Sequence, residues 1–157
     1  MFAKTRKAIP SLAGAAVLGA LALGGIASGG TAAAGPMVDV WKAATCECCE
    51  GWIRHMMAAG FAVKVHEVED VEPVKEKSGV PGPLHSCHTA VVDGYVVEGH
   101  VPAGDVKRLL AERPNATGLS VPGMPQDAPG MDMGTGEPFQ VVLFGTPDGT
   151  MRVYASH

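Results

Sequence analysis

The sequence predicts a single α/β domain with a thioredoxin-like core, and three observations lead to this prediction. The first is a strand–helix–strand order within about thirty residues, as in a βαβ unit. The second is a β-hairpin followed by a helix. The third is a cysteine pair placed where the first strand leads into the first helix. A loop rich in Met, Gly and Pro and an extra β-hairpin complete the expected fold.

The first residues have the three-part plan of a secretory signal peptide. A short basic start precedes an uncharged apolar stretch over residues 12–26, and an Ala-x-Ala motif ends at Ala34. We therefore expect a signal peptide over residues 1–34 and a mature periplasmic domain over 35–157, exported by the general secretory route. A retained membrane anchor is the alternative, but the apolar stretch is shorter than the roughly 20 residues of a spanning helix.

The expected mature domain is acidic. Three of the 12 Lys and Arg residues lie in the leader, whereas all 16 Asp and Glu residues lie beyond it, which leaves a net charge of −7. Nucleic acids bind basic surfaces, whereas an acidic surface suits cations. We therefore expect no nucleic-acid partner. Once the leader is removed, we also expect no membrane span.

Hydrophobic periodicity and turn signals set the order of the expected elements. They are a strand at 38–41, a helix after the cysteines that stops at Gly60, a strand at 61–68, a short charged helix within 70–77, hairpin strands at 90–92 and 95–97, a helix at 103–112, a loop at 118–136, and hairpin strands at 139–144 and 151–154. The first two strands should be parallel, because a helix connects them. Asp93-Gly94 supports the first hairpin, because this pair suits a two-residue turn.

Three of the four cysteines, Cys46, Cys48 and Cys49, lie within four positions. Cys46 and Cys49 have the spacing of a redox or metal pair, and the start of a helix favours the thiolate form. Together with Cys87 from a distant loop they suit a soft metal, since thiolates select Cu(I), zinc or iron–sulfur clusters. Zinc sites usually use two separated cysteine pairs. Adjacent thiolates suit bridging, which favours a multinuclear Cu(I) site.

Two other interpretations of the cysteines stay open. Disulfides Cys46–Cys49 and Cys48–Cys87 would make a structural scaffold, because an oxidising compartment permits bridges. A thiol–disulfide oxidoreductase that uses Cys46 and Cys49 is the second alternative, although two further thiols would divert a simple exchange.

Histidine and methionine side chains extend the candidate site. His88 directly follows Cys87, and His100 lies at the end of a strand, so each could be a ligand. His88 could also serve Cys87 as a base. Met124 and Met131 lie in the loop where no core requires them, and thioether sulfur is also a soft ligand for Cu(I). We expect this loop to cover the site, to supply ligands, or both.

Four motifs together carry a resemblance to a known family. They are Cys46-x-Cys48-Cys49, Cys87-His88-Thr89, Gly99-His100-Val101-Pro102, and Gly118-Leu119-x-x-Pro122-Gly123-Met124-Pro125 with Pro129-Gly130-Met131. In this order they resemble the domain of unknown function 411 family, which includes the CopG-type copper-resistance proteins of bacterial periplasms. The resemblance implies a modified thioredoxin fold, copper bound by the four cysteines, and interconversion of Cu(I) and Cu(II) in copper detoxification. It implies His88 and His100 as neighbours of the site.

The sequence therefore predicts a periplasmic copper-binding protein that works with other copper-handling proteins. Cysteine thiolates favour Cu(I), while histidine nitrogen tolerates Cu(II). A mixed site of Cys87, His88 and His100 would let copper change its oxidation state, so an oxidoreductase-like activity on copper stays open.

Overall fold

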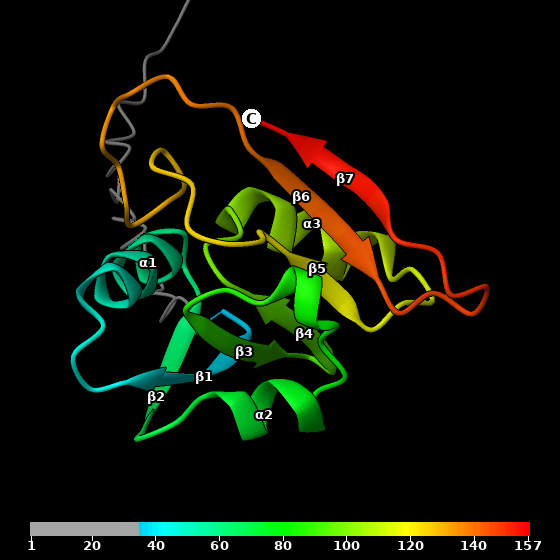
Figure 1. Cartoon of the computed structure of the whole chain (residues 1–157), viewed down its shortest axis with the longest axis horizontal. Coiled ribbons are helices and arrows are strands. Elements are labelled where there is room, and N and C mark those ends of the chain that lie inside the picture. Colours follow the sequence, from blue (N-terminus) through cyan, green and yellow to red (C-terminus); the bar gives the residue numbers. More distant parts are fainter. Residues whose placement is uncertain (1–34) are drawn as a thin grey trace, which may run out of the picture. The chain divides into compact units, whose positions relative to one another are not determined.

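The computed structural model describes residues 35–157, and the predicted signal peptide over residues 1–34 lies outside them. A seven-stranded mixed sheet in the order β2-β1-β3-β4-β5-β6-β7 organises the described part (Figure 1). The elements are β1 (Met37–Ala43), α1 (Glu47–Ala58), β2 (Ala62–Val68), α2 (Glu72–Lys77), a 3-10 helix (Gly82–Leu84), β3 (His88–Val92), β4 (Tyr95–Glu98), α3 (Ala103–Glu112), β5 (Gly118–Ser120), β6 (Gln140–Phe144) and β7 (Arg152–Ser156). The predicted mixture of helices and sheet in one α/β fold is confirmed.

The β1-α1-β2 segment has the parallel arrangement that the sequence predicts, with Val38 paired to Val63. Alternate residues of β1 point into the core, where Val38 and Val40 are fully buried. On α1 the buried face carries Trp52 and Met56, which are one helical turn apart. The helix therefore packs its apolar face on the sheet and leaves its first turn, with the cysteines, at the end of β1.

The strands β3 and β4 form the predicted hairpin. Both turn residues, Asp93 and Gly94, have positive φ, which is the backbone of a tight hairpin turn. Val97 belongs to the main core with α1 and α3, while the neighbouring Val96 packs in a second, smaller cluster with Leu84. β4 is thus buried on both faces, and its end is a sheltered place for polar side chains.

One expectation is wrong at the beginning of the predicted loop 118–136. Gly118–Ser120 forms β5, which pairs in parallel with β4 and antiparallel with β6. Three residues are too few to show a strand period, and Gly118 gives no hydrophobic signal. The glycine is needed because a Cβ at this position would overlap the carbonyl of Val96. No helix or strand occurs from residue 121 to 139.

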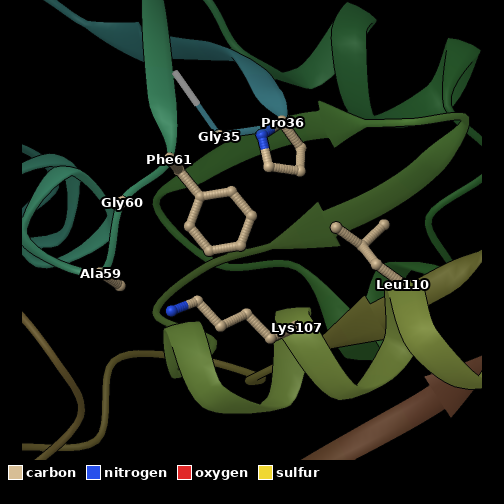
Figure 2. Close-up of a pocket in the computed structure, with 7 residues that line it drawn as sticks. All are labelled: Gly35, Pro36, Ala59, Gly60, Phe61, Lys107 and Leu110. Carbon is tan, nitrogen blue, oxygen red and sulfur yellow. The ribbon is translucent and has the colours of Figure 1, made fainter. Parts of the chain in front are cut away.

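A cavity of about 320 Å³ lies between the α1–β2 turn and α3 (Figure 2). Its lining residues are Gly35, Pro36, Ala59, Gly60, Phe61, Lys107 and Leu110. None of the predicted metal ligands lines it, so the candidate chemistry lies elsewhere. No described helix combines the length and the hydropathy of a membrane-spanning helix.

Candidate metal centre

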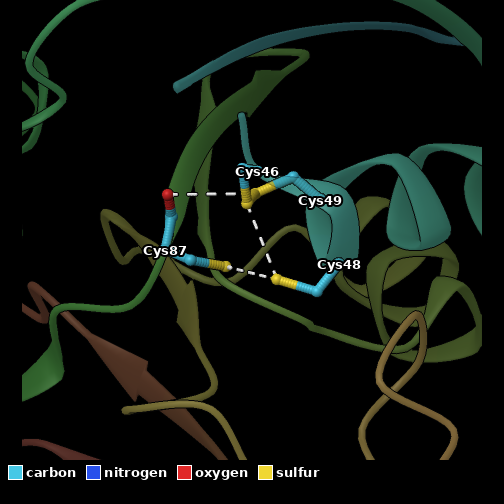
Figure 3. Close-up of side chains that lie close together, drawn as sticks. All are labelled: Cys46, Cys48, Cys49 and Cys87. Atoms are coloured by element: carbon cyan, nitrogen blue, oxygen red, sulfur yellow. Dashed lines mark hydrogen bonds between the residues drawn. A yellow bond between two sulfur atoms is a disulfide. The ribbon is translucent and has the colours of Figure 1, made fainter. Parts of the chain in front are cut away.

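The cysteine turn and the Cys87 loop meet where β1 ends and β3 begins (Figure 3). Cys46 is the N-cap residue of α1, so the helix start places its neighbours toward the loop. The Sγ atom of Cys48 lies 3.6 Å from that of Cys46 and 4.0 Å from that of Cys87. The ligand atoms of all four cysteines lie within 4.8 Å of one another. Sulfur atoms almost forty residues apart in the chain therefore share one site.

The cysteines are partly oxidised in this structure. Cys46 and Cys49 form a disulfide, while Cys48 and Cys87 are free thiols (Figure 3). The two-bridge scaffold considered from the sequence is therefore only half formed. The arrangement also differs from four free thiolates, which would require reduction of the Cys46–Cys49 bond.

A second group of ligand atoms shares Cys87 with the first. The Cys87 Sγ lies 3.3 Å from Nδ1 of His88 and 2.8 Å from Nε2 of His100, and the three ligand atoms fall within 4.8 Å. Nδ1 of His100 lies 2.8 Å from the carbonyl oxygen of Pro129, which can only accept a hydrogen bond. This contact assigns the proton to Nδ1 and leaves the Nε2 lone pair directed at the thiol. Such a nitrogen can accept the S–H proton or bind a metal.

His88 is completely buried beside Trp52, with the ring centroids 4.4 Å apart. Its Nε2 atom has no hydrogen-bond partner within residues 35–157. Burial, and after it the positive charges that His100 and Lys75 can carry, hold the pKa of His88 well below its usual range. The ring is therefore neutral at neutral pH. A neutral imidazole can offer Nδ1, the nitrogen that faces the Cys87 sulfur, as a metal ligand.

The thiol of Cys87 stays protonated when no cation is near. Burial raises its pKa to about 12, and the neighbouring Cys48 adds to the effect. Burial also lowers the pKa of His100, against the opposing effects of the Pro129 carbonyl and Asp132. A soft cation would have to displace the thiol proton, so metal binding here releases protons.

The segment over residues 121–139, the methionine loop, covers both halves of the site with its backbone. The N–H of Gly123 donates to the carbonyl of His85 at 3.1 Å. At Gly130 a Cβ would lie 2.7 Å from the Cys48 carbonyl oxygen, so this glycine packs closely on the first turn of α1. Met131 is half-buried and Met124 is 57% exposed. The loop is thus in place as a cover, while the Met124 side chain faces largely toward solvent.

Comparison with known proteins points to one family. Residues 84–131 match the family described as "Protein of unknown function, DUF411". A solved structure named "Copper resistance protein copG- Form 2" is 45% identical, with a TM-score of 0.73, and the match covers 78% of this chain and 98% of that chain. The chain belongs to the DUF411 family. A second structure, "Copper resistance protein copG- Form 1", is 46% identical with a TM-score of 0.72, covering 77% of this chain and 96% of that one. No curated protein matches.

The DUF411 match contains five of the residues singled out from the sequence and leaves out the three-cysteine turn. The five are Cys87, His88, His100, Met124 and Met131.

The sequence analysis missed the buried charged residues around the four cysteines. Lys42, which is fully buried, lies 2.8 Å from Glu50 of α1. Lys75 and Glu98, next to the Cys87 loop, form an ion pair in which both partners are buried. Charged residues are almost never fully buried without a partner. Because the fold brings the partners together, the sequence alone does not show which charged residues are buried. The only available signal was the charge of Glu98 within an otherwise apolar strand.

Proposed function

We propose that this protein binds Cu(I) in the periplasm through Cys46, Cys48, Cys49 and Cys87, with His88 and His100 beside them. The observation that carries the proposal is the 4.0 Å separation between the Sγ atoms of Cys48 and Cys87, which come from distant parts of the chain. Two similar solved structures, matched over 78% and 77% of this chain, are named copper resistance proteins. A donor set of thiols and neutral imidazoles suits copper, because both are ligands that it prefers.

The state of the cysteines would decide which copper ion the site favours. With the Cys46–Cys49 disulfide reduced, four thiols are available and favour several Cu(I) ions held by bridging sulfurs. With the disulfide formed, Cys87 remains beside the two histidines and the Cys48 thiol lies 4.0 Å from it, a mixed set that also accepts Cu(II). Forming the disulfide releases two electrons and two protons, which balances the reduction of two Cu(II) to two Cu(I). The same residues could therefore interconvert the two ions.

The proposal also includes a thioredoxin-like core, export by a signal peptide, and transfer of copper by the methionine loop. The strand order β2-β1-β3-β4, with a helix after β1 and another after β4, supports a thioredoxin-like core. The plan of residues 1–34 supports export by a cleaved signal peptide. The exposure of Met124 and the packing of Gly130, next to Met131, on α1 support a loop that hands copper to other periplasmic copper-handling proteins. This chain would then take copper ions as its substrate or cargo.

A Cu(I) titration of the reduced protein against a competing chelator tests the proposal. We expect Cys48→Ser and Cys87→Ser each to lower the Cu(I) affinity by tenfold or more, on the order of the loss expected when one ligand or its support is removed. Met151→Leu is the matched control, because this exposed methionine lies before β7 outside the loop. Unchanged affinity and stoichiometry in both serine variants would reject the copper site, and a preference for zinc would reject the choice of metal.

A second candidate function is thiol–disulfide exchange, and the Cys46–Cys49 disulfide at the start of α1 favours it. In such enzymes the helix start stabilises the attacking thiolate. Cys48 would compete, because its Sγ is 3.6 Å from that of Cys46. Reduction of insulin by the metal-free protein separates the two functions. Rapid turnover that Cys46→Ser abolishes would support the enzyme.

A further inference from the structure

A buried ion pair lies beside the Cys87 loop, and the proposed copper site does not use it. Glu98, the last residue of β4, is fully buried, and its Oε1 lies 2.6 Å from Nζ of Lys75, which is 1% exposed. Removing two charges from water is costly, and a hydrophobic pair of similar volume is often as stable. The pair therefore needs an explanation other than stability.

The carboxylate of Glu98 binds the chain on both sides of Cys87. Its Oε1 accepts the backbone N–H of Ser86 at 2.7 Å, and its Oε2 accepts the hydroxyl of Thr89 at 2.7 Å. Lys75 Nζ also donates to the Thr89 oxygen, at 3.2 Å. Only Cys87 and one further residue lie between the two bound positions, so this short segment is fixed at both ends.

Gly99 and His100, which follow Glu98 in the chain, also contact the Cys87 loop. The N–H of Gly99 donates to the carbonyl of His88 at 2.9 Å, and Nε2 of His100 lies 2.8 Å from the Cys87 Sγ. Gly99 has a φ of 71°, and a Cβ on it would overlap the side chain of Ser86. The absence of a side chain at this position lets the end of β4 approach the loop closely.

We propose that Glu98 is a positioning residue for Cys87. Its carboxylate, neutralised by Lys75, holds the Cys87 thiol next to the Cys48 thiol before any metal arrives. A metal that recruits a ligand from a loose loop must order that loop on binding, which weakens its affinity. Residues that orient ligands from behind matter nearly as much as the ligands themselves. The consequence for copper rests on the proposed function, whereas the position of the thiol does not.

The first test needs no metal and uses the oxidised protein, in which Cys48 and Cys87 are the two free thiols. Both thiols are alkylated with iodoacetamide under native conditions, and the rate at each is read from its peptide by mass spectrometry. Cys48 serves as the internal reference. We expect Glu98→Gln to raise the Cys87-to-Cys48 rate ratio severalfold, because the loop is released. An unchanged ratio would overturn the inference.

Two controls separate positioning from a general loss of stability. Asp105→Asn makes the same carboxylate-to-amide change at a buried position of α3 that binds His157 instead. Val97→Ala weakens the core one residue before Glu98 without touching the carboxylate. A rise in the ratio of the same size in Val97→Ala, at matched stability, would overturn the inference. Should Glu98→Gln fail to fold, Thr89→Val decides, since it removes only one of the bonds to the carboxylate.

The second test is a double-mutant cycle on Cu(I) affinity. We expect Glu98→Gln to weaken Cu(I) binding roughly tenfold to a hundredfold. In a Cys87→Ser background the same change should cause no further loss, because the residue to be positioned is gone. An equal loss in both backgrounds would show that Glu98 does not act through Cys87. If Cys87→Ser alone leaves the affinity unchanged, the proposed function fails, and the alkylation ratio still decides the positioning.

Discussion

The two cysteine-bearing segments of the site are held in different ways. The turn with Cys46, Cys48 and Cys49 is fixed by the start of α1, where the backbone of one helix sets the spacing of the sulfurs. The loop with Cys87 is fixed from outside, by the buried carboxylate of Glu98 and by contacts with the end of β4. Local geometry thus places three cysteines, and tertiary contacts place the fourth. The position of Cys87 is therefore the one that depends on the whole fold.

The largest expected effect comes from removing the side chain that joins the two segments. Trp52 of α1 is fully buried, packs on His88, and donates from Nε1 to the Val101 carbonyl at 2.8 Å. Trp52→Ala should lower the free energy of unfolding by about 3–5 kcal/mol, as large aromatic truncations in cores do. Denaturant unfolding followed by circular dichroism measures the loss.

The control for this prediction is the other tryptophan. Trp41 is half-buried and stacks on His66, with ring centroids 4.7 Å apart. Trp41→Ala should therefore destabilise the protein clearly less. An equal loss for both variants would mean that the contact between α1 and the Cys87 loop contributes no more to the free energy of unfolding than the stacking of Trp41 on His66 does.

A smaller effect is expected where the methionine loop packs on the three-cysteine turn. Gly130 has a φ of 92°, and a Cβ there would meet both the Cys48 carbonyl and the backbone N of Trp52. Gly130→Ala should cost about 1–3 kcal/mol, because it adds overpacking to backbone strain. Gly134→Ala is the matched control, since this glycine also has a positive φ, 67°, but open space around it. Thermal unfolding that shows no difference between the two variants would contradict the close packing of the loop.

The smallest effect should appear at His55, in the last turn of α1, at the opposite end of the helix from the cysteines. Its Nε2 accepts the N–H of Ala103 at 2.9 Å and so caps the start of α3. His55→Ala should cost about 1 kcal/mol at neutral pH, as the loss of a helix cap does. Unfolding measured at neutral pH checks this value.

The contribution of His55 should also depend on pH. Burial lowers the pKa of His55 from its ordinary value of 6.5, against the opposing effect of Asp132. The unfolded chain then binds the proton more tightly than the folded chain. The stabilisation is present above pH 6.5 and is lost as the pH falls through the lowered pKa. The difference between wild type and His55→Ala should shrink over this range, and a difference that grows on acidification would reverse the assignment.

The sequence was informative where structure is local and less so where it is not. The α3 helix and the hairpin around Asp93-Gly94 follow from periodicity and turn chemistry, and they occur where predicted. The short strand β5 was missed because neighbouring strands, and not its own residues, hold it in the sheet. The proximity of Cys48 and Cys87 was expected from motifs alone. The buried Glu98 that holds this loop was missed, because the burial of a charge depends on a distant partner, here Lys75.

X-ray absorption at the copper edge shows directly whether both cysteine segments supply sulfur to copper. Reduced wild type and Cys87→Ser are loaded with Cu(I), and the nearest ligands of copper are counted by element. We expect a shell dominated by sulfur in the wild type and fewer sulfur ligands per copper in Cys87→Ser. Identical spectra for the two proteins, or a shell of nitrogen and oxygen in the wild type, would contradict a copper site built by both cysteine segments.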